Sequence, residues 1–125
     1  SNGVFMYAIL DAQKLLNELR PVFTHRLCEA ESWNGLAQIQ CDEDSIFLEK
    51  AGEGVQQVVW TNQPIDFKVK LSRSILTKLM FGVADPVKCY KDGQLAVEST
   101  VDKTQTVKLL ERLFAKSQFL IADFW

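Results

Sequence analysis

Cysteine is scarce in this sequence. The three cysteines, Cys28, Cys41 and Cys89, are odd in number and widely spaced, and none belongs to a CxxC pair. Disulfide frameworks and zinc sites need paired or closely spaced cysteines. The sequence therefore argues against both, and we expect three buried apolar thiols in a reducing compartment.

A stripe of basic charge and a long apolar run are also missing. The 14 basic and 16 acidic residues are scattered and give a net charge of −2, so no basic surface is expected to follow a phosphate backbone. No apolar run approaches the roughly 20 residues of a membrane-spanning helix. A signal-peptide pattern is absent as well. These features predict a cytoplasmic protein that neither binds nucleic acid nor spans a membrane.

Motifs that carry catalysis are missing too. His25 is the single histidine, and no nucleophile or orienting carboxylate accompanies it in a motif, so we expect it on the surface of a helix. The sequence has no GxSxG, HExxH or phosphate-binding loop. Asp42, Glu43 and Asp44 lack the spaced ligands and the glycine of a calcium loop, which favours a solvated turn. We expect no activity, metal or cofactor in this chain by itself.

The composition that is present is that of a globular domain. The 125 residues, 47% apolar and 24% charged, fit one domain over residues 1–125 with a core of its own. The chain opens on Ser1, Asn2 and Gly3 rather than on Met, which resembles a cleavage scar. We expect a domain taken from the C-terminus of a larger protein.

Alternating and helical spacings divide the chain into strands and helices. Helices are expected over residues 12–19 and 21–27, separated by Pro21, and after the N-caps Ser72 and Asp102. Short turns between consecutive strands favour antiparallel pairing. The sequence predicts an α+β fold, a mainly antiparallel sheet of about five strands with helices packed on one face. The expected strands are Val4–Leu10, Ala37–Cys41, Ile46–Glu49, Val55–Thr61, Phe67–Leu71, Leu95–Glu98 and Phe119–Phe124.

The large apolar side chains could either fill the core or line a ligand cavity. Trp33 and Trp60 fit both, and the core is favoured because tryptophan dominates packing wherever it occurs. The strand at residues 67–71 and the apolar stripe of the next helix are expected to face each other. A largely filled core is expected over an open tunnel, since these bulky residues must share one small domain.

One stretch resembles the sterol carrier protein family. Residues 67–82 form a strand and a helix that stops at Gly82, and turn signals follow at Asp85-Pro86 and Lys91-Asp92-Gly93. The resemblance implies a five-stranded sheet covered by helices, with an apolar space for lipids. The pocket residues that it implies are Phe67, Leu71, Ile75, Leu79, Met80 and Trp60.

Both ends resemble the domain that closes Eis-like bacterial GNAT acetyltransferases. Residues 7–11, before a Leu-rich helix, are similar to its opening, and residues 109–114 and 119–125 are similar to its ending, although a final Trp departs from the pattern. The resemblance implies upstream GNAT domains that bind acetyl-CoA and a homo-oligomeric parent enzyme. It also implies that the C-terminal carboxylate, here that of Trp125, reaches the catalytic centre.

Three functional hypotheses are therefore open. The leading one is a non-catalytic C-terminal domain of an N-acetyltransferase, which shapes the substrate pocket and supplies the chain terminus to it. The alternative is a lipid- or hydrophobe-binding domain of the sterol carrier type. The third is an interaction domain that only drives oligomerisation. For the aromatic end of the chain, the alternative to a catalytic carboxylate is that it only packs.

Overall fold

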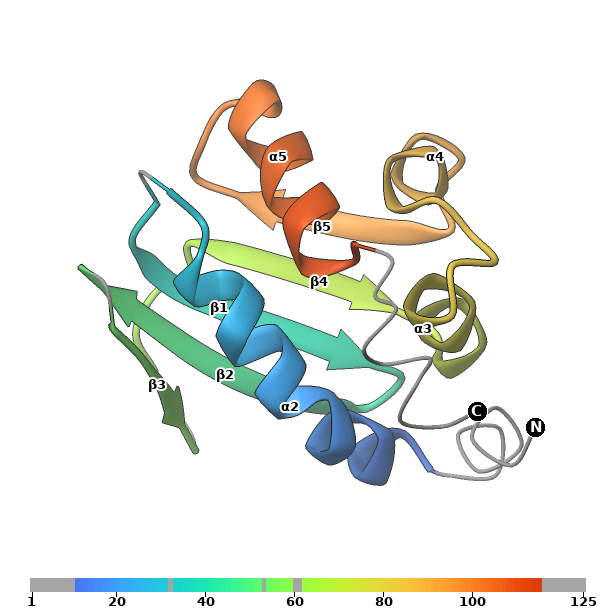
Figure 1. Ribbon diagram of the computed structural model, residues 1–125, viewed down its shortest axis with the longest axis horizontal. Helices are drawn as coiled ribbons and strands as arrows, with labels where there is room; N and C mark the ends of the chain where they lie inside the picture. The colour runs from blue at the N-terminus through green and yellow to red at the C-terminus, as the bar shows by residue number, and fades with distance from the viewer. Residues whose placement is uncertain (1–10, 32, 53, 60–61, 116–125) are drawn as a thin grey trace.

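The computed structural model describes residues 11–31, 33–52, 54–59 and 62–115. Within them, five strands form one sheet in the order β3-β2-β1-β4-β5 (Figure 1). The strands predicted at residues 4–10 and 119–124 lie outside the described residues. The bounds are β1 Gly35–Cys41, β2 Asp44–Ala51, β3 Gly54–Val58, β4 Phe67–Leu71 and β5 Leu95–Ser99.

The sheet is mixed, because β1 and β4 pair in parallel while the other three pairings are antiparallel. The short turns between consecutive strands predicted mainly antiparallel pairing, and they did not predict this parallel pair. The chain leaves β3 and returns to the end where β1 begins, where Asp66 anchors it. The Asp66 N–H donates to the Leu36 carbonyl (2.9 Å), and the Leu36 N–H donates to Asp66 Oδ2 (2.8 Å). A Cβ on Gly35 would lie 2.6 Å from that carboxylate oxygen, so only glycine fits there.

The helices of the described residues lie on one face of the sheet. Figure 1 shows α2 and α5 in front of the sheet, with α3 and α4 beside them at one end. Alternate residues of β4, Phe67, Val69 and Leu71, are buried in the same core as Leu79 and Leu110 of the helices. This confirms the predicted α+β fold. The bounds are α2 Ala12–Cys28, α3 Arg73–Met80, α4 Pro86–Lys91 and α5 Lys103–Leu113.

The prediction that Pro21 separates two helices is wrong, because α2 continues through it. Proline inside a helix removes one backbone hydrogen bond and crowds the preceding turn. The helix tolerates it because a single apolar stripe along its whole length packs on the sheet. Leu15, Leu19, Phe23 and Leu27 of that stripe are all essentially inaccessible.

The segment around Asp85 and Pro86 was predicted as a turn but begins helix α4. Asp85 Oδ2 accepts from the Lys88 N–H (3.0 Å), and Pro86 occupies the first turn, where its missing N–H costs nothing. The predicted turn at residues 91–93 is the stop of this helix. The Gly93 φ of 77° lets the Gln94 N–H reach the Cys89 carbonyl (2.8 Å).

Capping follows the sequence closely elsewhere. The side chains of Asp11, Ser72 and Asp102 each accept from a backbone N–H three residues ahead, as their N-cap positions predict. Helix α3 ends at Met80, and Gly82 stands just past its end as predicted, with a φ of 72°. The Val83 N–H then donates to the Lys78 carbonyl (2.8 Å), a Schellman stop that aims the next segment toward α5.

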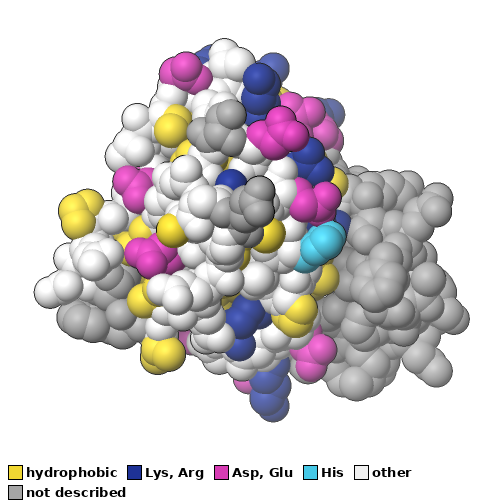
Figure 2. All heavy atoms as spheres, turned by 60° about the vertical axis from the view of Figure 1, so that its left-hand side comes forward, with side chains coloured by type: hydrophobic (Ala, Val, Ile, Leu, Met, Phe, Trp, Pro, Cys, Tyr) yellow, Lys and Arg dark blue, Asp and Glu magenta, His cyan; other side chains and the backbone are white. Residues whose placement is uncertain are grey.

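The surface seen in Figure 2 mixes acidic and basic side chains without a patch of one sign. That view brings the left-hand side of Figure 1 forward, so it shows the side of the molecule that carries the β3 edge. No helix among the described residues has the length and hydrophobicity needed to cross a membrane.

Candidate functional site

The residues predicted to line a pocket lie mostly in the closed core. Phe67, Leu71, Leu79 and Met80 are buried, with at most 4% of their surface exposed, and Ile75 is half-buried. Trp60 lies outside the described residues. Of this set, Leu79 also borders a surface hollow, so it connects the core to the outside. Trp33, for which the core was favoured, is 2% exposed and belongs to the core.

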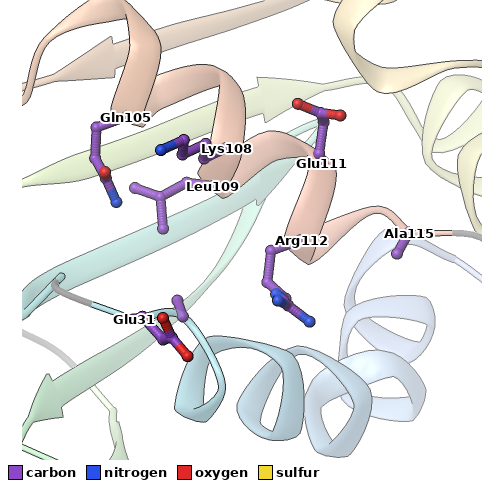
Figure 3. Close-up of a pocket in the computed structure, with 8 residues that line it drawn as sticks. Glu31, Gln105, Lys108, Leu109, Glu111, Arg112 and Ala115 are labelled. Carbon is purple, nitrogen blue, oxygen red and sulfur yellow. The ribbon is translucent and has the colours of Figure 1, made fainter.

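One hollow separates α5 from the connection that follows α2, and we call it the α2–α5 hollow (Figure 3). Its volume is about 550 Å³. The buried side chains of Ala30 and Leu109 line it between more polar neighbours. In Figure 3, Lys108 and Arg112 project from α5, and Glu31 lies on the connection below Leu109. The remaining lining residues are Gln105, Glu111 and Ala115.

Two buried cations hold the walls of the α2–α5 hollow in place. Arg26 Nη1 of α2 donates to the Leu113 carbonyl at the end of α5 (2.8 Å), and burial lowers the pKa of Arg26. Lys50 Nζ of β2 donates to the carbonyls of Ala30 (2.5 Å) and Trp33 (2.9 Å). Without these bonds, the three carbonyl groups at or after the helix ends would be buried without a hydrogen-bond partner. They set the spacing between α5 and the connection.

A second hollow, the α3–α5 hollow, lies on the other side of the last turn of α5. Its volume is about 410 Å³, and it shares Glu111 and Ala115 with the first. Buried Leu79 and Phe114 line it, together with Val83, which is 74% exposed. Phe114 is held from behind by an edge-to-face contact with Phe23, with ring centroids 5.6 Å apart. The remaining lining residues are Gly82, Ala84, Asp85 and Pro86.

The two buried thiols of the described chain have raised pKa values. Burial, with Asp42 next, raises the pKa of the Cys41 thiol to about 12, and burial also raises the pKa of Cys89. Neither thiol is therefore a thiolate nucleophile at neutral pH. The third thiol, Cys28, is exposed, so the expectation that all three are buried is wrong.

Histidine and metal chemistry find no support in the described part of the chain. His25 lies on the surface of α2 as expected, with Nε2 2.9 Å from Glu29 Oε1. Asp42 occupies the turn between β1 and β2 with a φ of 54°. Among the described residues, no group of three His, Cys, Asp or Glu side chains could hold a metal ion.

Sequence reasoning missed the polar residues of the α2–α5 hollow. Gln105, Lys108 and Arg112 are spaced by three and four residues, so helical periodicity places them on one face of α5. That signal was available in the sequence. It could not show that this face looks across a hollow at Glu31, because the approach of α5 to the end of α2 is a tertiary contact.

Similar architectures exist among solved structures. Sterol carrier protein 2 like 2 from Aedes aegypti is 13% identical, with a TM-score of 0.59, over 81% of this chain and 98% of that one. Sterol carrier protein 2 from Yarrowia lipolytica is 17% identical, with a TM-score of 0.51, over 81% and 84%. The fold is that of sterol carrier protein 2. No family model and no curated protein matches the sequence.

The sterol carrier protein 2 fold also occurs inside a larger enzyme. A double mutant of the sec-alkyl sulfatase PisA1, an enzyme from Pseudomonas sp., matches 89% of this chain with a TM-score of 0.61 and 17% identity. This chain spans only 17% of the sulfatase chain. At such identities the likeness shows a shared fold and leaves the ligand to be argued from the site.

Proposed function

We propose that this domain binds an amphipathic lipid reversibly and performs no chemistry on it. The observation that carries the proposal is the sterol carrier protein 2 fold, which spans nearly the whole of a free-standing carrier-like protein. The two hollows beside α5 support it, because about 410 and 550 Å³ are volumes typical of small-ligand sites.

The hydrocarbon part of the ligand is assigned to the α3–α5 hollow. Val83, which is 74% exposed, offers apolar surface there above buried Leu79 and Phe114. Phe67, Leu71 and Met80 form the packed core beneath them. The polar head is assigned to the α2–α5 hollow, where Lys108 and Arg112 stand one turn apart. Two carboxylates, Glu31 and Glu111, line the same hollow. We assign an anionic head to the side of Lys108 and Arg112, where two cations can give charge-assisted hydrogen bonds.

Displacement of a fluorescent fatty-acid probe tests the proposal. We expect saturable binding that a natural fatty acid competes for, and a clear loss of affinity in Val83→Asp, which places a charge in the α3–α5 hollow. The matched control is Ala96→Asp, the same new charge on an exposed residue of β5. The absence of saturable binding, or equal losses in the two variants, would contradict the proposal.

A second candidate is an accessory domain of a larger enzyme, and the fold's presence within the alkylsulfatase favours it. The Eis-like resemblance makes that parent an N-acetyltransferase, with acetyl-CoA bound by upstream GNAT domains and the Trp125 carboxylate near the reaction. Trp125 and the segment around it lie outside the described residues. In such a parent, extending the chain beyond Trp125 should lower kcat with folding unchanged. Full kcat in the extended enzyme would exclude a catalytic carboxylate.

A further inference from the structure

The outer edge of β3 offers unpaired backbone groups. Within the described residues β3 pairs only with β2, from Ala51↔Gly54 to Phe47↔Val58, and it stands at the end of the sheet (Figure 1). Such an edge is a template for another strand, and proteins usually protect it with lysine, proline, a bulge or a covering element. The residues along the β3 edge therefore show whether it is protected.

The sequence from Gly54 onward carries little that protects this edge. Residues 54–65 contain no charged side chain, although 24% of the whole chain is charged, and the first proline comes at Pro64. The opposite edge strand, β5, carries Glu98. A helix contacts each edge strand, α2 at β3 and α4 at β5, so the two edges differ in charge. The contrast indicates that the β3 edge is kept free for pairing, while the β5 edge is not.

We propose that two copies of this chain pair through β3 in an antiparallel ladder centred on Gln57. A two-fold axis normal to the sheet keeps both helix layers on the same face, so a central residue must pair with its own copy. With Gln57 at the centre, Val59 lies opposite Val55 of the second copy. Val59 is 87% exposed and Val55 is partly buried against the core, so pairing covers the most exposed large apolar side chain described.

The register centred on Gln56 is less favourable. It would set Val59 opposite Glu53 of the second copy, an apolar residue against an acid. Gln56 Nε2 also donates to Glu49 Oε1 (3.1 Å) on the uncovered face of the sheet. The Gln57 register leaves that bond intact and extends the ladder by one residue beyond Val58, where β3 ends.

This assembly is independent of the proposed lipid site. The β3 edge is separate from the hollows beside α5, because no residue of β3 lines either hollow. Pairing through β3 therefore leaves both hollows open. The two proposals can fail separately.

Sedimentation over a concentration series tests the dimer. We expect a reversible dimer for the wild-type chain, and a dissociation constant raised on the order of tenfold or more in Gln57→Lys, because the two lysines would meet at the axis. Val59→Lys should act in the same direction. The matched control is Ala96→Lys on the opposite edge strand, which should dimerise like wild type, with circular dichroism confirming the fold of each variant.

Cross-linking tests the register. In a Cys28→Ser background, which removes the exposed native thiol, Gln57→Cys should form a disulfide-linked dimer under mild oxidation and Ala96→Cys should not. A wild-type chain that stays monomeric at its highest soluble concentration overturns the proposal. So does a dimer that survives both lysine substitutions, or one in which Gln57→Cys fails to cross-link.

Discussion

Individual buried residues decide how the walls of the candidate site are held. Arg26 and Lys50 are charged groups inside the core, 8% and 6% exposed, and each donates to backbone carbonyls next to the α2–α5 hollow. Charges are seldom buried without such partners. Their presence at both walls suggests that the spacing of this hollow is built rather than incidental.

The cations of α5 should select the head of the ligand. Replacing Lys108 and Arg112 together with Gln removes two positive charges from the α2–α5 hollow without touching the core, since both are exposed. We expect the affinity for a fatty acid to fall about tenfold, which is about 1.4 kcal/mol, and the affinity for the matching fatty alcohol to change little. Competition titrations with both ligands measure this. Equal losses for acid and alcohol would contradict an anionic head at this position.

Leu79 links the core with the α3–α5 hollow. It is fully buried, so Leu79→Ala should lower the free energy of unfolding by about 2–5 kcal/mol. Urea denaturation measures the change, and Ile75→Ala at a half-buried position on the same helix should cost less. A loss below about 0.5 kcal/mol at Leu79 would place it in a solvent-filled space rather than a packed core.

The raised pKa of the Cys41 thiol predicts that the domain loses stability at alkaline pH. Burial and Asp42 raise its pKa from 9.0 to about 12 in the folded chain. Above pH 9 the unfolded chain releases this proton while the folded chain keeps it, so stability is fully present below pH 9 and declines from there toward pH 12. We expect Cys41→Ala to flatten that decline in urea denaturation, and Cys28→Ala, at an exposed thiol, to leave it unchanged. Identical slopes in wild type and Cys41→Ala would count against the raised pKa.

At the scale of elements, α2 is a helix kept whole by packing. Pro21 leaves one carbonyl of the helix without its usual N–H partner, yet the buried stripe on both sides of Pro21 keeps the helix continuous. Local propensity favoured a break, and burial of the stripe outweighed it.

Removing this proline should therefore stabilise the domain. In Pro21→Ala the helix regains a hydrogen bond and loses a steric clash, which outweighs the smaller entropy advantage of proline in the unfolded chain. We expect the melting temperature to rise, with a gain of roughly 1 kcal/mol or more. Calorimetry measures it, with Arg20→Ala as a neighbouring control. A lower melting temperature would mean that Pro21 fits a bend that the packing requires.

At the scale of the whole molecule, the described residues form hollows beside α5 but no recognisable group of catalytic side chains. The buried thiols, Cys41 and Cys89, have raised pKa values and so are not ionised at neutral pH. The His25–Glu29 pair is exposed to solvent and so is not enclosed as an active site would be. The hollows instead combine apolar walls with charged rims. That combination fits a lipid carrier and an accessory domain of a larger enzyme equally well. Identifying the ligand and the parent protein would distinguish the two.

Acetyl-CoA should not bind this chain by itself. The sequence has no phosphate-binding loop, and such loops are what hold the pyrophosphate of a nucleotide cofactor. Isothermal titration should show no saturable heat with acetyl-CoA, while a fatty acid titrated into the same sample should. Saturable acetyl-CoA binding would move the acetyltransferase chemistry into this domain and contradict our reading of its hollows.

The sequence by itself determined the strands of the described sheet and the caps of several helices. Alternation in residues 67–71 exposes one side of a strand and buries the other, and Ser72 and Gly82 mark the limits of α3 through local backbone bonds. Local rules suffice there because cap and element lie within a few residues. The same rules also read Asp85-Pro86 as a turn, although an N-cap followed by proline is equally a helix start.

Tertiary structure decided what those elements do together. Three features depend on which strand or helix lies next to which: the parallel pairing of β1 with β4, the continuity of α2 through Pro21, and the edge position of β3 within the described sheet. The same holds for the hollows, where Lys108 and Arg112 acquire a role only because Arg26 brings α5 against the end of α2. Contacts between residues more than 80 positions apart leave no local pattern in the sequence, and burial energy in the assembled core selects among them.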